Sequence, residues 1–159
     1  KDTDKFKGLR YKIIGDDSDD YAPVLGIYKG LLEAGSHFSF IIACDMPVIS
    51  LNYINYLKER LEKSSFPKDG LISMNGSFIE PFHSFYSKNM LEKIKYNIGM
   101  KDYKISNFIN VCNVEFINTE TIKKYTGSTD IFTNLNYPCD LEIFSGAFIK
   151  ELCPNDKKH

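Results

Sequence analysis

The chain has 159 residues, enough for one domain with a buried core and too few for two domains of ordinary size. Its 20 basic and 21 acidic side chains are scattered and leave a net charge of −1, so we expect no nucleic-acid partner. The longest apolar run, residues 38–44, is far shorter than a membrane span, and the amino terminus does not resemble a signal peptide. We therefore expect a single domain over residues 1–159 that has no membrane partner.

The predicted elements of the first half begin with a strand at 11–14, followed by an acidic loop. A helix should start near Pro23, because proline fits the first helical turn, and should end at Gly35. A buried strand at 38–44 follows, and then a helix that Ser50 caps. The apolar face of that helix should comprise Leu51, Ile54, Leu57 and Leu61.

The second half continues the alternation. Strands at 71–74 and 78–86 flank Asn75-Gly76, which is a strong hairpin signal. Further segments are predicted as a helix capped by Ser87, a short helix at 103–109, strands at 111–117 and 132–135, and a final helix at 140–152. Alternating strands and helices favour an α/β layered domain.

The four cysteines have no spacing typical of a zinc site. Two of them, Cys44 and Cys112, lie in apolar runs, where a thiol is usually a small core residue. This usage predicts a cytoplasmic protein without structural disulfides.

The most informative segment is Ile41-Ile42-Ala43-Cys44-Asp45-Met46, followed by Pro47. A buried strand here would deliver one carboxylate, Asp45, to the carboxyl edge of a sheet, where open α/β folds bind their ligands. A carboxylate in that place suits Mg²⁺ that carries substrate phosphates. The alternative interpretation is that Asp45 only caps the next turn.

Three segments in order, residues 22–31, 43–47 and 133–141, resemble the motifs of the molybdenum cofactor guanylyltransferases, the MobA-like family of nucleotidyltransferases. Residues 80–86, Glu-Pro-Phe-His-Ser-Phe-Tyr, are similar to a further strand of that family. The resemblance implies a Rossmann-like, three-layer α/β fold with a mostly parallel sheet. The family's first motif, a glycine-rich segment that wraps the nucleotide phosphates, has no counterpart here. We therefore expect an amino-terminally truncated domain, or alternatively a member that has lost catalysis.

The resemblance also implies an activity: transfer of GMP from GTP to the molybdopterin cofactor, with Mg²⁺ as the metal and pyrophosphate as the leaving group. Asp45 then matches the family's catalytic metal ligand, which also binds the nucleotide, and Asp16 matches a nucleotide-binding aspartate. Asn134 and Asn136 match a pair of asparagines that face the substrate. The alternatives are another base or acceptor, such as a cytidylyltransferase of the same cofactor, and a non-catalytic domain that binds molybdopterin or a partner. A molybdoenzyme apoprotein or a second copy of the chain are possible partners.

Several of these residues also have a structural interpretation. The acidic run at 16–20 could be a solvated loop, and Asn134 and Asn136 could form a turn before the last helix. Asp140 is predicted to cap that helix, and His83 is interpreted as a core residue between aromatic neighbours. Gly26 and Gly30 would let their helix pack closely on the sheet.

Overall fold

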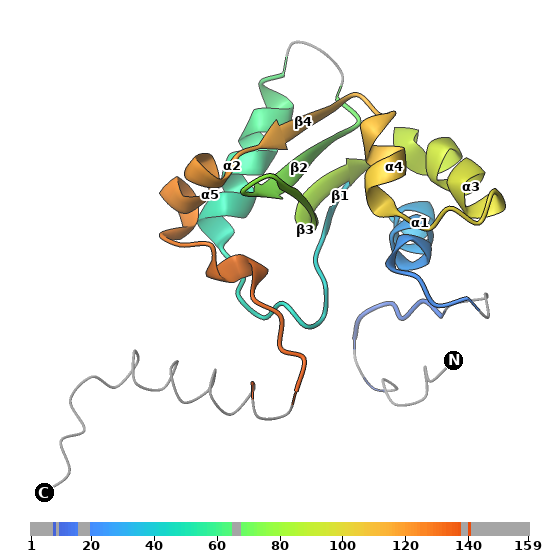
Figure 1. Ribbon diagram of the computed structural model, residues 1–159, viewed down its shortest axis with the longest axis horizontal. Coiled ribbons are helices and arrows are strands. Elements are labelled where there is room, and N and C mark those ends of the chain that lie inside the picture. The colour runs from blue at the N-terminus through green and yellow to red at the C-terminus, as the bar shows by residue number, and fades with distance from the viewer. Residues whose placement is uncertain (1–7, 9, 16–19, 65–67, 138–139, 141–159) are drawn as a thin grey trace, which may run out of the picture.

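The centre of the molecule is a four-stranded sheet (Figure 1). The computed structural model describes residues 8, 10–15, 20–64, 68–137 and 140. The strands lie in the order β1-β3-β2-β4, with β1 at Phe38–Ile41, β2 at Gly70–Asn75, β3 at Phe78–Ser87 and β4 at Val114–Ile117. β3 pairs antiparallel with both β1 and β2, whereas β2 and β4 are parallel. Three strands thus run in one direction, as predicted for this fold, and β3 runs against them.

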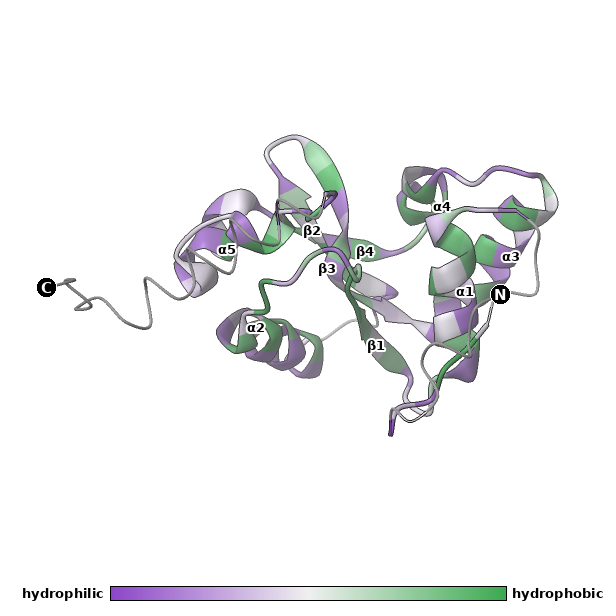
Figure 2. Cartoon of the chain, turned by 90° about the horizontal axis from the view of Figure 1, so that it is seen from below, coloured by the Kyte–Doolittle hydropathy of each residue, from purple (hydrophilic) through white to green (hydrophobic). Residues whose placement is uncertain are grey.

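Helices cover both faces of the sheet (Figures 1 and 2). One side carries α1 (Pro23–Glu33), α3 (Leu91–Gly99) and α4 (Ile105–Asn110), and the other carries α2 (Leu51–Glu62) and α5 (Thr119–Thr126). Two short 3₁₀ helices, η2 (Lys88–Met90) and η3 (Asp130–Phe132), complete the described elements. The three-layer α/β architecture expected from the sequence is confirmed. Within the described ranges, none of these helices has the length and apolar character needed to cross a membrane.

The helix ends follow local chemistry. Pro23 occupies the first turn of α1, and the Ser50 hydroxyl accepts a hydrogen bond of 3.3 Å from the Tyr53 N–H at the start of α2. Both starts confirm the prediction. At α5, the Asn118 side chain accepts from the Thr121 N–H at 2.8 Å, and Gly127 ends the helix with a φ of +80°.

Two apolar clusters hold the three layers together. The first joins α1, α3 and α4 to the sheet, and its buried members are Val24, Ile27, Leu31, Ile72, Tyr86, Met90, Ile94, Phe108 and Ile109. The second joins α2 and α5 to the other face, and its buried members are Tyr53, Leu57, Leu71, Phe85, Ile117, Ile122 and Ile131. Because β2 contributes Leu71 to one cluster and Ile72 to the other, the alternation of its side chains separates the two cores.

The β2–β3 hairpin confirms the Asn-Gly prediction with a shift of one residue. Asn75 pairs with Phe78, so the two loop residues are Gly76 and Ser77, and Gly76 has a φ of +63°. At the far end of the hairpin, a Cβ on Gly70 would lie 2.5 Å from the carbonyl oxygen of Phe85. Glycine is therefore required there for the two backbones to approach.

Other predicted elements differ from the structure. Residues 11–15 form no strand, and residues 133–136 belong to no strand of the sheet. β1 and β4 are shorter than predicted, because residues 42–44 and 111–113 belong to connecting segments. The side chain of Leu51 is 71% exposed, so it does not belong to the buried face of α2. The predicted helix at 140–152 lies outside the described residues except for Asp140.

Ser87 precedes η2, but its side chain makes no capping hydrogen bond. Its hydroxyl is buried and has no partner among the described residues. The α5 helix was absent from the sequence prediction, since Ile122 is its only fully buried residue. The signals that could have revealed it are the Asn118 cap and Gly127.

Candidate active site

Asp45 lies just beyond the carboxyl end of β1, as the sequence predicted. The chain leaves the sheet after Ile41 and makes a turn in which the Met46 N–H donates to the Ala43 carbonyl at 3.2 Å. The Met46 side chain is buried, whereas the Asp45 side chain is half-buried. The buried methionine anchors the turn and leaves the neighbouring carboxylate accessible.

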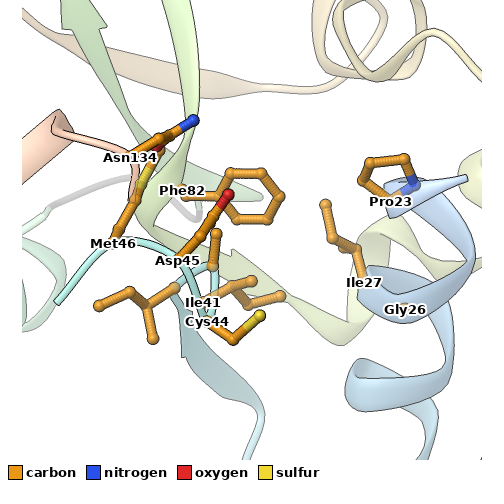
Figure 3. Close-up of a pocket in the computed structure, with 11 residues that line it drawn as sticks. Pro23, Gly26, Ile27, Ile41, Cys44, Asp45, Met46, Phe82 and Asn134 are labelled. Carbon is orange, nitrogen blue, oxygen red and sulfur yellow. The ribbon is translucent and has the colours of Figure 1, made fainter. Parts of the chain in front are cut away.

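A second segment joins this turn from the far end of the chain. The Leu135 N–H donates to the Asp45 carbonyl at 2.8 Å, which brings Asn134 beside Asp45 (Figure 3). The Asp140 carboxylate accepts from the N–H groups of Asn136 and Tyr137, at 2.9 Å each. Asp140 thus holds the turn at 136–137, whereas the helix that it was predicted to cap lies outside the described residues.

The two segments line a cavity of about 480 Å³ between the sheet and α1 (Figure 3). Asp45, Met46 and Asn134 lie on one side of it, and Pro23, Gly26 and Ile27 of α1 lie across from them. Phe82 of β3 and residues 41–44 complete the lining. Parts of all four segments that carry the family resemblance therefore meet at one cavity.

The predicted site residues are placed unequally. Asp45 and Asn134 line the cavity together, whereas Asn136 is exposed and does not line it. The two asparagines therefore do not share the same surroundings, although they alternate along the chain. Asp16 lies outside the described residues.

Two interpretations of small residues are wrong. A Cβ on Gly26 or Gly30 would meet nothing within 4 Å, so neither glycine is needed for close packing of α1 on the sheet. Gly26 instead faces the cavity, a role that sequence reasoning missed. Cys44 is exposed at the cavity rather than part of the core, because it lies beyond the end of β1.

A large irregular bulge in β3 forms one wall of the site. Leu71 pairs with Phe85 and Ser73 with Glu80, so four residues of β3, 81–84, lie opposite one residue of β2. Bulges of this kind re-aim side chains and are common beside active sites. Here the bulge brings Phe82 to the cavity and places His83 in the left-handed region, with a φ of +55°.

Buried hydroxyl groups support this bulge. The Ser73 hydroxyl donates to the His83 carbonyl at 2.6 Å, and it therefore accepts from the Tyr53 hydroxyl at 2.8 Å. The Ser84 hydroxyl accepts from the Ser73 N–H at 2.9 Å. The Tyr86 hydroxyl donates to the Pro81 carbonyl at 2.6 Å. Burial raises the pKa values of both tyrosines, so these hydroxyls remain protonated donors.

His83 is a core residue, as predicted, and it also contacts both segments of the site. Its Nε2 lies 2.9 Å from the Val48 carbonyl, so Nε2 carries the proton and donates. Its ring packs edge-on against Phe40 of β1 and Phe132 of η3, with centroids 6.0 Å apart in each case. Burial lowers the pKa of His83, and the bond to Val48 offsets only part of that effect.

The oxygen ligands of the cavity suit a hard cation. Across the part of the chain that the structure describes, no three His, Cys, Asp or Glu side chains gather into a complete metal centre. The cavity instead offers one carboxylate, from Asp45, and one amide, from Asn134. Mg²⁺ is commonly bound through one or two carboxylates while substrate phosphates and water fill its other positions, so these residues fit Mg²⁺.

An α/β sheet with a carboxylate beside a cavity at the end of a strand is typical of nucleotide-binding enzymes. The family model for the MobA-like NTP transferase domain matches residues 1–113. The chain belongs to this family of nucleotidyltransferases, as the sequence motifs predicted.

Related proteins agree with this assignment. The chain is 32% identical over 151 residues to a probable molybdenum cofactor guanylyltransferase of Peptoclostridium acidaminophilum, covering 93% of this chain and 68% of that protein. It is 31% identical over 137 residues to the molybdenum cofactor guanylyltransferase of Syntrophotalea carbinolica, covering 86% of this chain and 64% of that protein. The chain thus spans about two thirds of the length of these relatives.

The fold resembles the crystal structure of molybdopterin-guanine dinucleotide biosynthesis protein A from Archaeoglobus fulgidus. The TM-score is 0.78 at 23% identity, and the match covers 93% of this chain and 74% of that one. This likeness confirms the predicted nucleotidyltransferase fold.

Proposed function

We propose that the protein transfers GMP from GTP to the molybdopterin cofactor. The observation that carries this proposal is the meeting of Asp45 and Asn134 at one cavity, although 89 positions separate them in the sequence. The relatives named molybdenum cofactor guanylyltransferase support the choice of GTP as donor and molybdopterin as acceptor. A biosynthetic enzyme that uses GTP fits the predicted cytoplasmic location.

The reaction needs alignment and charge neutralisation rather than a covalent enzyme intermediate. A terminal phosphate oxygen of molybdopterin attacks the α-phosphorus of GTP, the bond from that phosphorus to the bridging oxygen breaks, and pyrophosphate leaves with the electron pair. Bound Mg²⁺ would supply positive charge against the phosphates.

The residues of this chain position the reactants. Asp45 would hold the metal, and the Asn134 amide would bind a phosphate oxygen or complete the metal's ligands without adding charge. The apolar wall formed by Pro23, Gly26 and Ile27 would exclude water from the opposite side. Asn136, at the exposed turn, and Asp16, in the acidic loop, remain proposed contacts to substrate and nucleotide.

The test is calorimetric titration of the full-length protein with GTP and CTP, each with and without Mg²⁺. We expect Asp45→Asn to weaken Mg²⁺-dependent GTP binding by about 10- to 100-fold, equivalent to roughly 1.4 to 3 kcal/mol for one charged ligand. Glu62→Gln is the matched control, because it removes one carboxylate from the exposed face of α2 and should leave binding unchanged.

The alternatives give different results in the same titration. A preference for CTP would identify a cytidylyltransferase. Absence of nucleotide binding by the folded wild-type protein would contradict the proposal and favour a non-catalytic binding domain. Equal GTP affinity of Asp45→Asn and wild type would remove Asp45 from the site.

A further inference from the structure

His83 touches the two segments that carry Asp45 and Asn134, although it does not line the cavity itself. Its Nε2–H donates to the carbonyl of Val48, three residues after Asp45. Its ring contacts Phe132, two residues before Asn134. Both contacts are made on the buried side of the two segments, since His83 is only 1% exposed.

We propose that His83 is a positioning residue that fixes the Asp45 turn against the Asn134 segment. The described hydrogen bond between the two backbones runs from the Leu135 N–H to the Asp45 carbonyl. That bond joins two half-buried residues, whereas the contacts of His83 with both segments are made by a buried side chain. The inference rests on the proposed function only for the identity of the ligand that the aligned residues bind.

The chemistry of the ring explains why histidine suits this place. The side chain must donate a hydrogen bond to the Val48 carbonyl, and it must also place a flat ring between Phe40 and Phe132. The other ring nitrogen, Nδ1, is buried and has no partner among the described residues. A proton on Nδ1 would therefore find no acceptor there, which keeps the ring neutral with Nε2 as its donor.

The backbone of the bulge holds His83 in this position. Its φ of +55° is unusual for a residue other than glycine, and such a conformation persists only where the surroundings enforce it. The Ser73 hydroxyl, itself bonded to Tyr53, donates to the His83 carbonyl. Tyr53 thus belongs to the same buried network but contacts neither site segment through a described hydrogen bond.

The test compares three variants of the full-length protein. His83→Leu removes the donor, and His83→Gln retains an amide donor of similar reach. Neither replacement is β-branched, so both meet similar backbone strain at residue 83. Tyr53→Phe is the matched control, because it removes a hydroxyl from the buried network without removing the bond to Val48.

The first measurement uses NMR to follow hydrogen exchange of the Leu135 amide. Amides of the strands are measured beside it, because their exchange reports unfolding of the whole domain. We expect His83→Leu to accelerate Leu135 exchange about ten-fold more than the reference amides, the scale of one lost hydrogen bond. His83→Gln should restore most of the protection, and Tyr53→Phe should change Leu135 and the reference amides equally.

The second measurement is Mg²⁺-dependent GTP affinity and, for active protein, the separate effects on kcat and KM. We expect His83→Leu to weaken GTP binding by about ten-fold at unchanged stoichiometry, while Gln and the Tyr53 control remain near wild type. If wild-type protein does not bind GTP, the proposed function fails, and Leu135 exchange still decides the role of His83. Unchanged Leu135 protection in His83→Leu, or failure of Gln to rescue it, would overturn the inference.

Discussion

The two helical layers differ in how they support the cavity. The layer of α1, α3 and α4 packs through a cluster dominated by apolar side chains and gives the cavity the apolar wall at Pro23, Gly26 and Ile27. The layer of α2 and α5 lies over the Ser73 hydroxyl, which supports the bulge, and over the His83 imidazole, which holds the Asp45 turn. Apolar packing has no preferred direction, whereas hydrogen bonds fix positions. Tyr86 of the first cluster also supports the bulge, but the hydrogen bond to Val48 lies on the face under α2 and α5. We therefore expect alignment of the Asp45 turn to depend mainly on that face.

The largest expected effect is a loss of folding stability, at unchanged GTP affinity, when the first apolar cluster is disrupted. Phe108 of α4 is fully buried in the first cluster. Phe108→Ala should lower the free energy of unfolding by about 3 to 5 kcal/mol, because it leaves a cavity in an apolar core. Urea denaturation measures this loss. Mg²⁺-dependent GTP affinity of the remaining folded protein should stay within about two-fold of wild type, and a ten-fold loss would show that the layers are not separate.

A smaller effect should appear on the polar side as a dependence on pH. Because the folded-state pKa of His83 lies below its ordinary value of 6.5, the unfolded chain binds the proton first as the pH falls. The free energy of unfolding should therefore decrease below about pH 6.5, by at most about 1.4 kcal/mol per pH unit, and level off below the folded-state pKa. The groups that the ring touches, Phe40, Phe132 and the Val48 carbonyl, do not titrate in this range.

The control for this pH dependence is His83→Gln, which removes the titrating ring and keeps the other histidines. The difference between wild type and this variant, measured by denaturation at several pH values, isolates the contribution of His83. A parallel pH dependence in both proteins would assign the effect to other groups.

The smallest expected effects come from two glycines of α1, whose replacement should change folding stability alike but GTP affinity differently. Gly26 and Gly30 both have room for a methyl group, but only Gly26 lines the cavity. Each Gly→Ala change should stabilise the protein by roughly 0.5 to 1 kcal/mol, because alanine loses less backbone entropy in a helix. Only Gly26→Ala should weaken GTP binding, as measured by calorimetry beside the thermal midpoints. Equal affinities of the two variants would place the nucleotide away from α1.

The sequence predicted those features that depend on local pattern or on the family motifs. The start of α1 at Pro23, the Ser50 cap and the hairpin at Asn75 follow from neighbouring residues. The proximity of Asp45 and Asn134 followed from the resemblance. The strand at 11–14 was predicted wrongly, because its short apolar pattern has no partner strand among the described residues.

The bulge could not have been predicted from its own residues. Hydrogen bonds of the Ser73, Ser84 and Tyr53 hydroxyls support it in the folded core, and two of these residues belong to other elements. The role of Gly70 depends in the same way on the nearby backbone of Phe85. Contacts between segments distant in the sequence determine the bulge and the need for glycine at position 70, and a single sequence carries no local signal for them.

The bond between Leu135 and Asp45 joins one backbone to another, from the N–H of one residue to the carbonyl of the other. Nineteen of the twenty amino acids carry that N–H, and proline alone lacks it. Substitutions at position 135 can therefore preserve the junction without any matching change at position 45. In sequences that diverge from this protein, we therefore expect no correlated substitutions between positions 45 and 135. The only expected sign of the hydrogen bond is that proline is rare at position 135.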